Sequence, residues 1–247
     1  MALEPDVLKP IERGEGRRTA VEVHDALRTS ILSGRLEPGT ILSQVEVARA
    51  LNVSRTPVRE AMRMLQEGGL VVGEPNFRGR VLGFDPKDIE ALYMKRIVLE
   101  PLGVAVTVRR ITPALRDSLR QVIRALEGKG SHTSFGRWLE LHRQFHHLIV
   151  SEAGEAFSAD MKALEQRSER YQSAYKREHL AGWWKRGDTE HRQIHEAMIK
   201  GEAQRAAELS ARHLARTALE LLAALAPEYD STGVRTSLRF ALAGAAA

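Results

Sequence analysis

The 247-residue chain contains no cysteine. Disulfides and thiolate metal sites are therefore excluded, and the composition suits a reducing cytoplasm, where we expect the protein to act. No run of roughly 18 apolar residues occurs and the N-terminus lacks the apolar segment of a signal peptide, so we expect neither membrane association nor export. Glycine and proline are scarce inside the periodic segments, and no alternating strand pattern follows residue 82, which predicts a helical second part.

The positive charge of the chain is unevenly distributed. A net charge of +5 and a pI near 9.7 suggest a polyanionic partner. However, residues 1–85 carry 12 basic and 12 acidic side chains, and the whole excess lies beyond residue 85. DNA binding by the N-terminal part must therefore depend on local placement. Between residues 49 and 80 there are six arginines against three glutamates.

Residues 47–70 contain the most informative pattern, which predicts a short helix, a tight turn and a second helix. Ser54 or Thr56 can cap the start of the second helix, and Pro57 suits its first turn. Apolar residues recur there at the i, i+3, i+4, i+7 spacing of a buried stripe, namely Val58, Ala61, Met62 and Leu65. The second helix should therefore dock on a small core through one face.

A different face of this helix carries Arg55, Arg59 and Arg63, one at every fourth position. Such a row is usually only a solvated surface. On a docked helix whose N-terminal amides are exposed, the same row suits the major groove of DNA. Amides and arginines can hold phosphate oxygens there, and arginine can read O6 and N7 of guanine with two parallel bonds.

The flanking segments extend the motif. Upstream, residues 26–43 predict an amphipathic helix that stops at Gly34 and a turn at Pro38-Gly39. Downstream, residues 70–82 predict two short strands joined by a turn at Pro75 to Gly79, with Arg78 and Arg80 at the tip. This order predicts a winged helix-turn-helix.

Four segments within about residues 20–84 resemble the N-terminal domain of the GntR superfamily of transcriptional regulators. They are Gly34-Arg-Leu-Glu-Pro-Gly39, Val53-Ser-Arg-Thr-Pro-Val-Arg-Glu-Ala61, Gly69-Leu70 and Arg78-Gly79. The resemblance implies that Arg55 and Arg59 touch DNA, with contributions from Thr56 and the wing around Gly79. The set that we expect at the DNA is Arg49, Ser54, Arg55, Thr56, Arg59, Arg78 and Gly79.

The domain organisation follows from these patterns. We expect a mobile arm over residues 1–18, the DNA-binding domain over 19–84, and a helical domain over 85–226 that begins at Asp85-Pro86. Residues 227–247 are consistent with a short last helix or a loose tail. The expected fold is mainly α, with a winged helix-turn-helix followed by an all-α six-helix bundle. Its helices are expected at 86–110, 114–127, 134–153, 157–178, 188–200 and 202–225.

Histidines mark the helical domain. His142 and His146 are spaced i, i+4, His191 begins a later helix and His213 lies on the last one. Imidazoles that converge from three helices could build a metal site inside a bundle. Isolated helical histidines are more often surface or core residues, so the residues alone leave both readings open.

Residues 88–223 resemble the ligand-binding FCD domain of the FadR subfamily, and six helices resemble its VanR-like branch. The segments that carry this resemblance are Arg96 before Leu99-Glu100, Leu141 with Phe145-His146, Glu190-His191 with Ala197, Gly201 with Ala206-Ala207, and His213-Leu214. The resemblance implies one divalent metal on His142, His146, His191 and His213. Position 142 departs from it, because an aspartate is usual there. Four neutral imidazoles favour zinc or nickel, and occupancy should fall as the pH drops through the low sixes.

The resemblance also directs Arg96 towards the metal, whereas a salt bridge with Glu100 is the simpler alternative. A metal with open positions beside a guanidinium suits a small carboxylate effector. His195, one turn beyond His191, would line the pocket or be exposed.

The expected protein is a regulator that binds an inverted-repeat operator as a homodimer and changes its DNA affinity with its ligand. Repression relieved by ligand is commonest in the resembled family. Two alternatives remain. One is a metal-dependent hydrolase, although no His-Glu-x-x-His motif occurs and Glu190 and Glu196 lie off the His191 face. The other is a DNA binder whose bundle is purely structural.

Overall fold

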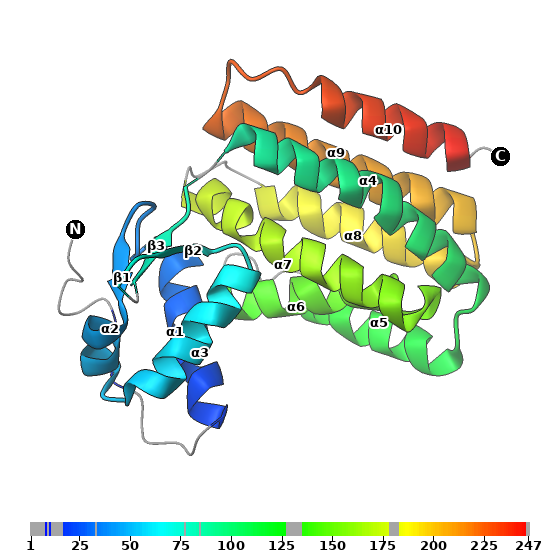
Figure 1. Ribbon diagram of the computed structural model, residues 1–247. Coiled ribbons are helices and arrows are strands. Elements are labelled where there is room, and N and C mark those ends of the chain that lie inside the picture. Colours follow the sequence, from blue (N-terminus) through cyan, green and yellow to red (C-terminus); the bar gives the residue numbers. More distant parts are fainter. Residues whose placement is uncertain are drawn as a thin grey trace. The chain divides into compact units, whose positions relative to one another are not determined.

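The computed structural model describes residues 8, 10, 17–32, 34–76, 78–83, 85–126, 135–177 and 183–245 (Figure 1). The chain forms two compact units. Residues 1–84 and 169–177 make up the winged-helix unit, and residues 85–168 and 178–247 make up the bundle unit. Most of the expected arm at residues 1–18 and the residues between the second and third expected helices, 128–133, lie outside the described residues.

The winged-helix unit has the predicted order of elements. Its elements are α1 (Arg17–Leu32), β1 (Ile41–Ser43), α2 (Gln44–Leu51), α3 (Arg55–Glu67), β2 (Val71–Glu74) and β3 (Arg78–Val81). The predicted hairpin of β2 and β3 is antiparallel, and β1 joins it on the other side of β3. Sequence reasoning missed β1, because three residues beside a turn are too few to show a strand pattern.

Helix α3 forms as predicted and packs through the predicted stripe. Its buried residues are Val58, Ala61, Met62 and Leu65, and it packs against α1. Asn52 adopts a left-handed conformation with φ 55° that ends α2 and turns the chain towards α3. Ser54 is the N-cap residue of α3, but its side chain makes no capping hydrogen bond, so the capping role expected of this side chain is not seen.

Gly79, which was expected at the DNA, packs tightly within the wing. It is buried in β3, between Leu42 of β1 and Gly73 of β2. A Cβ atom on Gly79 would lie 2.3 Å from Cε of Met62 and 2.5 Å from Cγ1 of Val71. The strand can therefore approach α3 closely only because this residue has no side chain.

The bundle unit contains the six expected helices, apart from residues 169–177 at the end of the fourth of them. They are α4 (Pro86–Arg109), α5 (Pro113–Leu126), α6 (Phe135–Leu148), α7 (Glu155–Arg177), α8 (Trp183–Lys200) and α9 (Ala203–Leu225). Helix α6 ends earlier than predicted, because a 3-10 turn, η1 (Ser151–Ala153), and Gly154 at φ 112° follow it. Helix α8 begins earlier than predicted, because Gly187 is accommodated within it.

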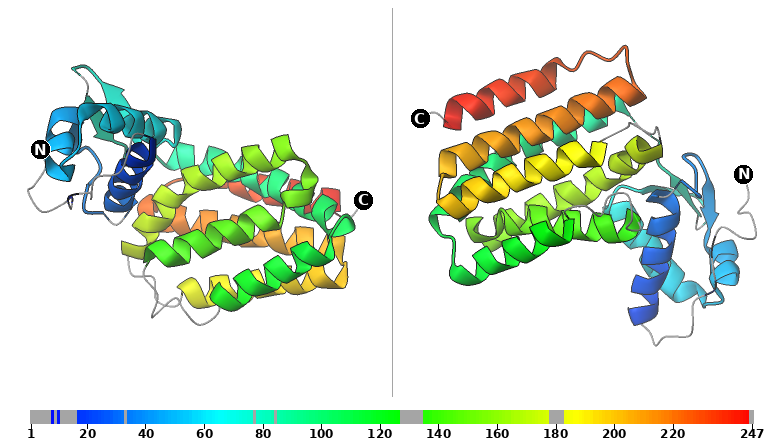
Figure 2. Two further views of the ribbon diagram at one scale, coloured as in Figure 1. Left: turned by 90° about the horizontal axis from the view of Figure 1, so that it is seen from below. Right: turned by 180° about the vertical axis from the view of Figure 1, so that it is seen from behind.

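Helix α4 packs against several other elements of this unit, namely α8, α9, α10 (Thr232–Ala245) and η1. It packs extensively against α9, which lies in front of α4 in the view from behind in Figure 2. The buried residues of α9 include the small side chains of Ala207, Ser210 and Ala211. None of the helices in the described ranges is long and apolar enough to cross a bilayer.

The C-terminal segment, which the sequence left open, forms helix α10 (Thr232–Ala245). It lies along α4 and α9 (Figure 1). The Glu90 carboxylate at the start of α4 accepts hydrogen bonds from the Tyr229 hydroxyl at 2.8 Å and from the Val234 amide at 3.2 Å. These bonds to the first turn of α10 and the segment before it explain why residues 227–245 are ordered on the bundle.

Candidate metal centre and nucleic-acid interface

The outward face of α3 carries the arginines predicted at the DNA. Arg55, Thr56 and Arg59 are exposed, and the Arg59 side chain retains 62% of its accessible surface. Arg63 is engaged by glutamates of its own helix, with Glu67 at 2.5 Å and Glu60 at 3.7 Å. Arg59, whose nearest acidic group is Glu60 at 3.8 Å, is therefore less engaged by acidic residues than Arg63.

The remaining predicted DNA residues lie on two other elements and at the start of α3. Arg49 on α2 and Ser54 before α3 are exposed. Along β3 the side chains alternate, so Arg78 and Arg80 are exposed while Gly79 faces the core. Arg80 forms an ion pair with Glu74 across the hairpin. Arg78 is therefore the wing arginine that we propose for a contact with the phosphate backbone of DNA.

The four predicted histidines converge inside the bundle unit. His142 and His146 come from α6, His191 from α8 and His213 from α9. All four are buried, and one ring nitrogen from each lies within 4.8 Å of those of the others. Nitrogen ligands about 2.0–2.1 Å from one zinc ion are at most about 4.2 Å apart. The spacing of the cluster is therefore close to that of a metal-bound set.

Unsatisfied ring nitrogens indicate that this cluster fits a cation. Nδ1 of His142, Nε2 of His146 and both ring nitrogens of His191 are buried without a hydrogen-bonding partner in the protein. A buried polar atom without a partner costs about 1–3 kcal/mol. Because each of these neutral rings offers one lone-pair nitrogen and the rings lie together, a divalent cation is the group that would satisfy one nitrogen of each.

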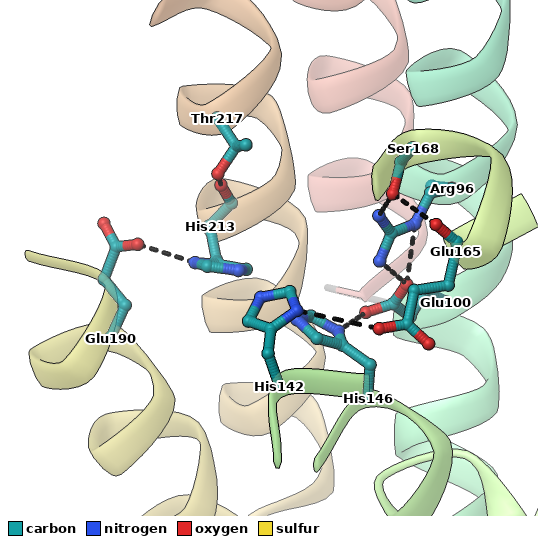
Figure 3. A network of polar contacts seen from close by, with 9 residues as sticks. All are labelled: Arg96, Glu100, His142, His146, Glu165, Ser168, Glu190, His213 and Thr217. Atoms are coloured by element: carbon teal, nitrogen blue, oxygen red, sulfur yellow. Dashed lines mark hydrogen bonds and ion pairs between the residues drawn. The ribbon is translucent and has the colours of Figure 1, made fainter. Parts of the chain in front are cut away.

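Two of the imidazoles are held by glutamates that sequence reasoning missed (Figure 3). Nδ1 of His146 lies 2.6 Å from a Glu100 oxygen, and Nδ1 of His213 lies 2.7 Å from a Glu190 oxygen. Glu190 directly precedes His191, which puts it off the His191 face but within reach of α9. The only sequence signal for these contacts was the acidic residue beside each motif.

Arg96 is buried and pairs with Glu100, which was the simpler of the two roles expected of it. Its side chain is buried, and it donates to the Glu100 carboxylate at 2.8 and 3.2 Å and to the Ser168 hydroxyl at 2.8 Å. A guanidinium has five N–H donors, so donors remain for a ligand.

His195 is half-buried and lies outside the four-histidine cluster. Trp138 stacks on His142 with ring centroids 4.7 Å apart.

Burial and neighbouring charges set the protonation states at the cluster. Burial lowers the pKa of His146 to about 4 despite the Glu100 carboxylate, and burial with the neighbouring imidazoles lowers the pKa of His142 and His191 well below 6.5. Although burial opposes ionisation of Glu100, Arg96 and His146 lower its pKa to about 2. The three imidazoles are therefore neutral at pH 7, which is the state that binds metal. Because their pKa values are lowered, protons should compete with the metal at a lower pH than the low sixes expected from the sequence.

The metal-free protein should lose stability as the pH falls from 6.5 towards 4. The folded protein leaves His146 neutral down to a pKa of about 4, whereas the unfolded chain protonates it near 6.5, so protonation favours unfolding. Each such group changes the free energy of unfolding by up to about 1.4 kcal/mol per pH unit. Denaturant titrations at several pH values between 6.5 and 5 give the free energy of unfolding as a function of pH. This free energy should change less steeply with pH in His146→Gln than in the wild type. The exposed His147→Gln is the control, and equal slopes for all three proteins would contradict the prediction.

Comparison with protein families covers both units. Residues 91–226 match the profile described as the FCD domain, and residues 19–77 match the profile described as bacterial regulatory proteins, gntR family. The chain is 32% identical over 139 residues to an uncharacterised helix-turn-helix transcriptional regulator of Agrobacterium vitis, covering 53% of this chain and 79% of that protein.

Other relatives share a smaller part of their length. The chain is 27% identical over 134 residues to the uncharacterised regulator YdhC of Bacillus subtilis, covering 53% of this chain and 58% of YdhC. It is 38% identical over 113 residues to the gluconate operon transcriptional repressor of Bacillus subtilis, covering 45% of this chain and 46% of that repressor. The chain therefore spans only about half the length of several curated relatives that it matches.

Solved structures share the fold. Escherichia coli McbR/YncC matches with a TM-score of 0.70 at 20% identity, covering 82% of this chain and 96% of that one. A regulator from Rhodococcus sp. RHA1 matches with a TM-score of 0.68 at 24% identity, covering 86% and 100%.

Proposed function

We propose that this chain is a metal-containing, ligand-responsive transcriptional repressor. It belongs to the GntR family of bacterial regulatory proteins and carries an FCD domain. The family makes it a transcriptional regulator. The sign of regulation is proposed because relatives from two Bacillus species are named as repressors. Such a regulator would act in the cytoplasm, where the chromosome lies.

The proposed DNA interface consists of the start of α3 and the wing. Arg55, Thr56 and Arg59 would enter the major groove, with Arg78 on the backbone. Within the described ranges, the first turn of α3 lacks an acidic residue, so nothing there opposes a phosphate. An inverted-repeat operator requires two such helices related by a two-fold axis, so we propose that the chain binds it as a homodimer.

His142, His146, His191 and His213 are the proposed ligands of one divalent ion, zinc or nickel. The observation that carries this proposal is the convergence of four buried imidazoles, three of which have a ring nitrogen without a partner in the protein. When bound, the ion would supply a Lewis-acidic positive charge at the centre of the bundle. The all-nitrogen set brings no negative charge of its own, so a carboxylate effector would be attracted to it.

Arg96 is the proposed second contact for the effector. Its bonds to Glu100 and Ser168 fix the guanidinium beside the cluster, and its remaining N–H groups could donate to a carboxylate oxygen of the effector. The Glu100 charge already compensates Arg96, so the attraction to an anionic effector comes mainly from the metal-bound histidine set. A ligand that fits one arrangement of the bundle better than another would shift the DNA affinity by that difference.

One titration series tests this function. Zinc-loaded protein is titrated into labelled inverted-repeat DNA selected from random sequence, with and without a panel of small organic acids. We expect two chains per repeat, and at least one acid that weakens binding by roughly 5–150-fold. The same acid should raise the melting temperature of the zinc-loaded protein but not of the metal-free protein. Binding of one chain per site, or failure to select any DNA sequence, would overturn the DNA proposal. If an acid weakens DNA binding equally with and without the metal, the metal-centred pocket is overturned.

A further inference from the structure

Two imidazoles of the histidine cluster share a pattern of support that the other two lack. Glu100 accepts from His146 and is itself held by Arg96, and Glu190 accepts from His213 and is itself held by Arg216. His142 lies 3.7 Å from the nearest Glu165 oxygen, beyond hydrogen-bonding distance, and His191 makes no hydrogen bond through its ring. The cluster thus has two oriented and two unsupported imidazoles.

The geometry of the Glu190 support is specific. Arg216 donates from Nε to one Glu190 oxygen at 2.6 Å and from Nη2 to the other at 2.5 Å, which fixes the plane of the carboxylate. The second of these oxygens is also the one 2.7 Å from Nδ1 of His213. Glu220 takes a further Arg216 donor at 2.7 Å. The Glu190 carboxylate therefore has one orientation, and it meets one nitrogen of the imidazole.

We propose that Glu190, held by Arg216, is a positioning residue that fixes the tautomer and ring orientation of His213 and so presents its Nε2 to the metal. This inference rests on the proposed metal centre. A carboxylate accepts only an N–H at Nδ1, so the lone pair of His213 stays on Nε2. Holding the imidazole in this state before the ion arrives removes an ordering cost from binding, and such support is typical of metal-binding histidines. Helix α8 therefore contributes to two ligands, through His191 itself and through Glu190 on His213.

Glu190 can be tested more cleanly than Glu100. Removing Glu100 would leave the buried Arg96 guanidinium without its carboxylate and would endanger folding. Glu190 and Arg216 are only partly buried, with side chains 25% and 21% exposed, so water can solvate the partner that remains. A loss measured at Glu190 therefore reports on the histidine rather than on a stranded charge.

The experiment measures zinc affinity of the full-length protein by competition with a chromophoric chelator, beside the melting temperature of the metal-free form. We expect Glu190→Ala to weaken zinc binding about 10–100-fold. Glu190→Gln should recover part of this loss, because its amide oxygen can still accept from Nδ1. Arg216→Met, which keeps the carboxylate but frees its plane, should fall between Glu190→Ala and the wild type. Glu140→Gln, an exposed carboxylate on α6 paired with Arg137, is the control.

A cobalt-substituted sample adds a readout that a purely stabilising ion pair would not move. The visible spectrum of bound cobalt should change in Glu190→Ala and remain that of the wild type in Glu140→Gln. Zinc affinity of Glu190→Ala within about threefold of the control, or an unchanged cobalt spectrum, would overturn the positioning role. If Glu190→Ala does not fold, the affinities of Glu190→Gln and Arg216→Met decide, and wild-type values for both would overturn it. Absence of zinc binding by the wild type would instead overturn the proposed metal centre.

Discussion

Replacing His146 by alanine should weaken zinc or nickel binding by more than about 100-fold. Changes in groups that merely support a ligand cost 10–100-fold, and His146 is buried with Nε2 unpaired and Nδ1 fixed by Glu100, so a larger loss is expected when the ligand itself is removed. The effector response should disappear with the metal, while operator binding without effector persists, because the DNA contacts lie in the winged-helix unit. Equilibrium dialysis with metal analysis measures the loss, and gel-shift titration measures the DNA affinity.

His147→Ala is the matched control for this prediction. It removes an imidazole from the next position of α6, but that side chain is exposed. His142→Ala separates two forms of the site: loss of metal comparable to that in His146→Ala makes His142 a ligand, and unchanged metal content restricts the set to three histidines. Full metal content in both the His142 and the His146 variants would contradict the proposed centre.

Arg55→Ala and Arg59→Ala should each weaken operator binding by about 1–3 kcal/mol, and they should relax the base preference at the positions that they read. Both side chains are exposed on the outer face of α3, and Arg59 has only a distant ion pair with Glu60 at 3.8 Å. Neither substitution touches the buried stripe that docks the helix, so folding should be unaffected. Gel-shift titrations on the selected operator and on single-base variants, repeated at several salt concentrations, provide the measurement.

Two further arginines serve as comparisons for the DNA prediction. Arg63→Ala removes a cation that Glu60 and Glu67 already engage, so it should change affinity less than the other helix variants. Arg78→Ala in the wing should weaken binding evenly across sequences and lower the salt slope by about one unit. If Arg55→Ala and Arg59→Ala both retain wild-type affinity, α3 is not the recognition helix.

Local patterns in the sequence were enough to predict the recognition helix and the six bundle helices. The stripe from Val58 to Leu65 has the period of a helix with one buried face, and that period depends only on neighbours along the chain. The same holds for the six bundle helices, which the sequence placed with ends within about five residues of those observed. Strand β1 and helix α10 were missed or left open because each depends on contacts with distant segments, β3 for the first and Glu90 of α4 for the second.

The site depended on tertiary structure to a greater degree. The i, i+4 spacing put His142 and His146 on one face of a helix, but only the packing of α6, α8 and α9 brought His191 and His213 to them. Glu100 and Glu190 escaped sequence reasoning because each supports a histidine on a different helix, 46 and 23 residues away. Gly79 was expected at the DNA, and only the approach of Met62 and Val71 revealed why a side chain is excluded there. Periodicity fixes which face of a helix is buried, whereas the partners of a buried polar group are chosen by the three-dimensional packing of several helices at once.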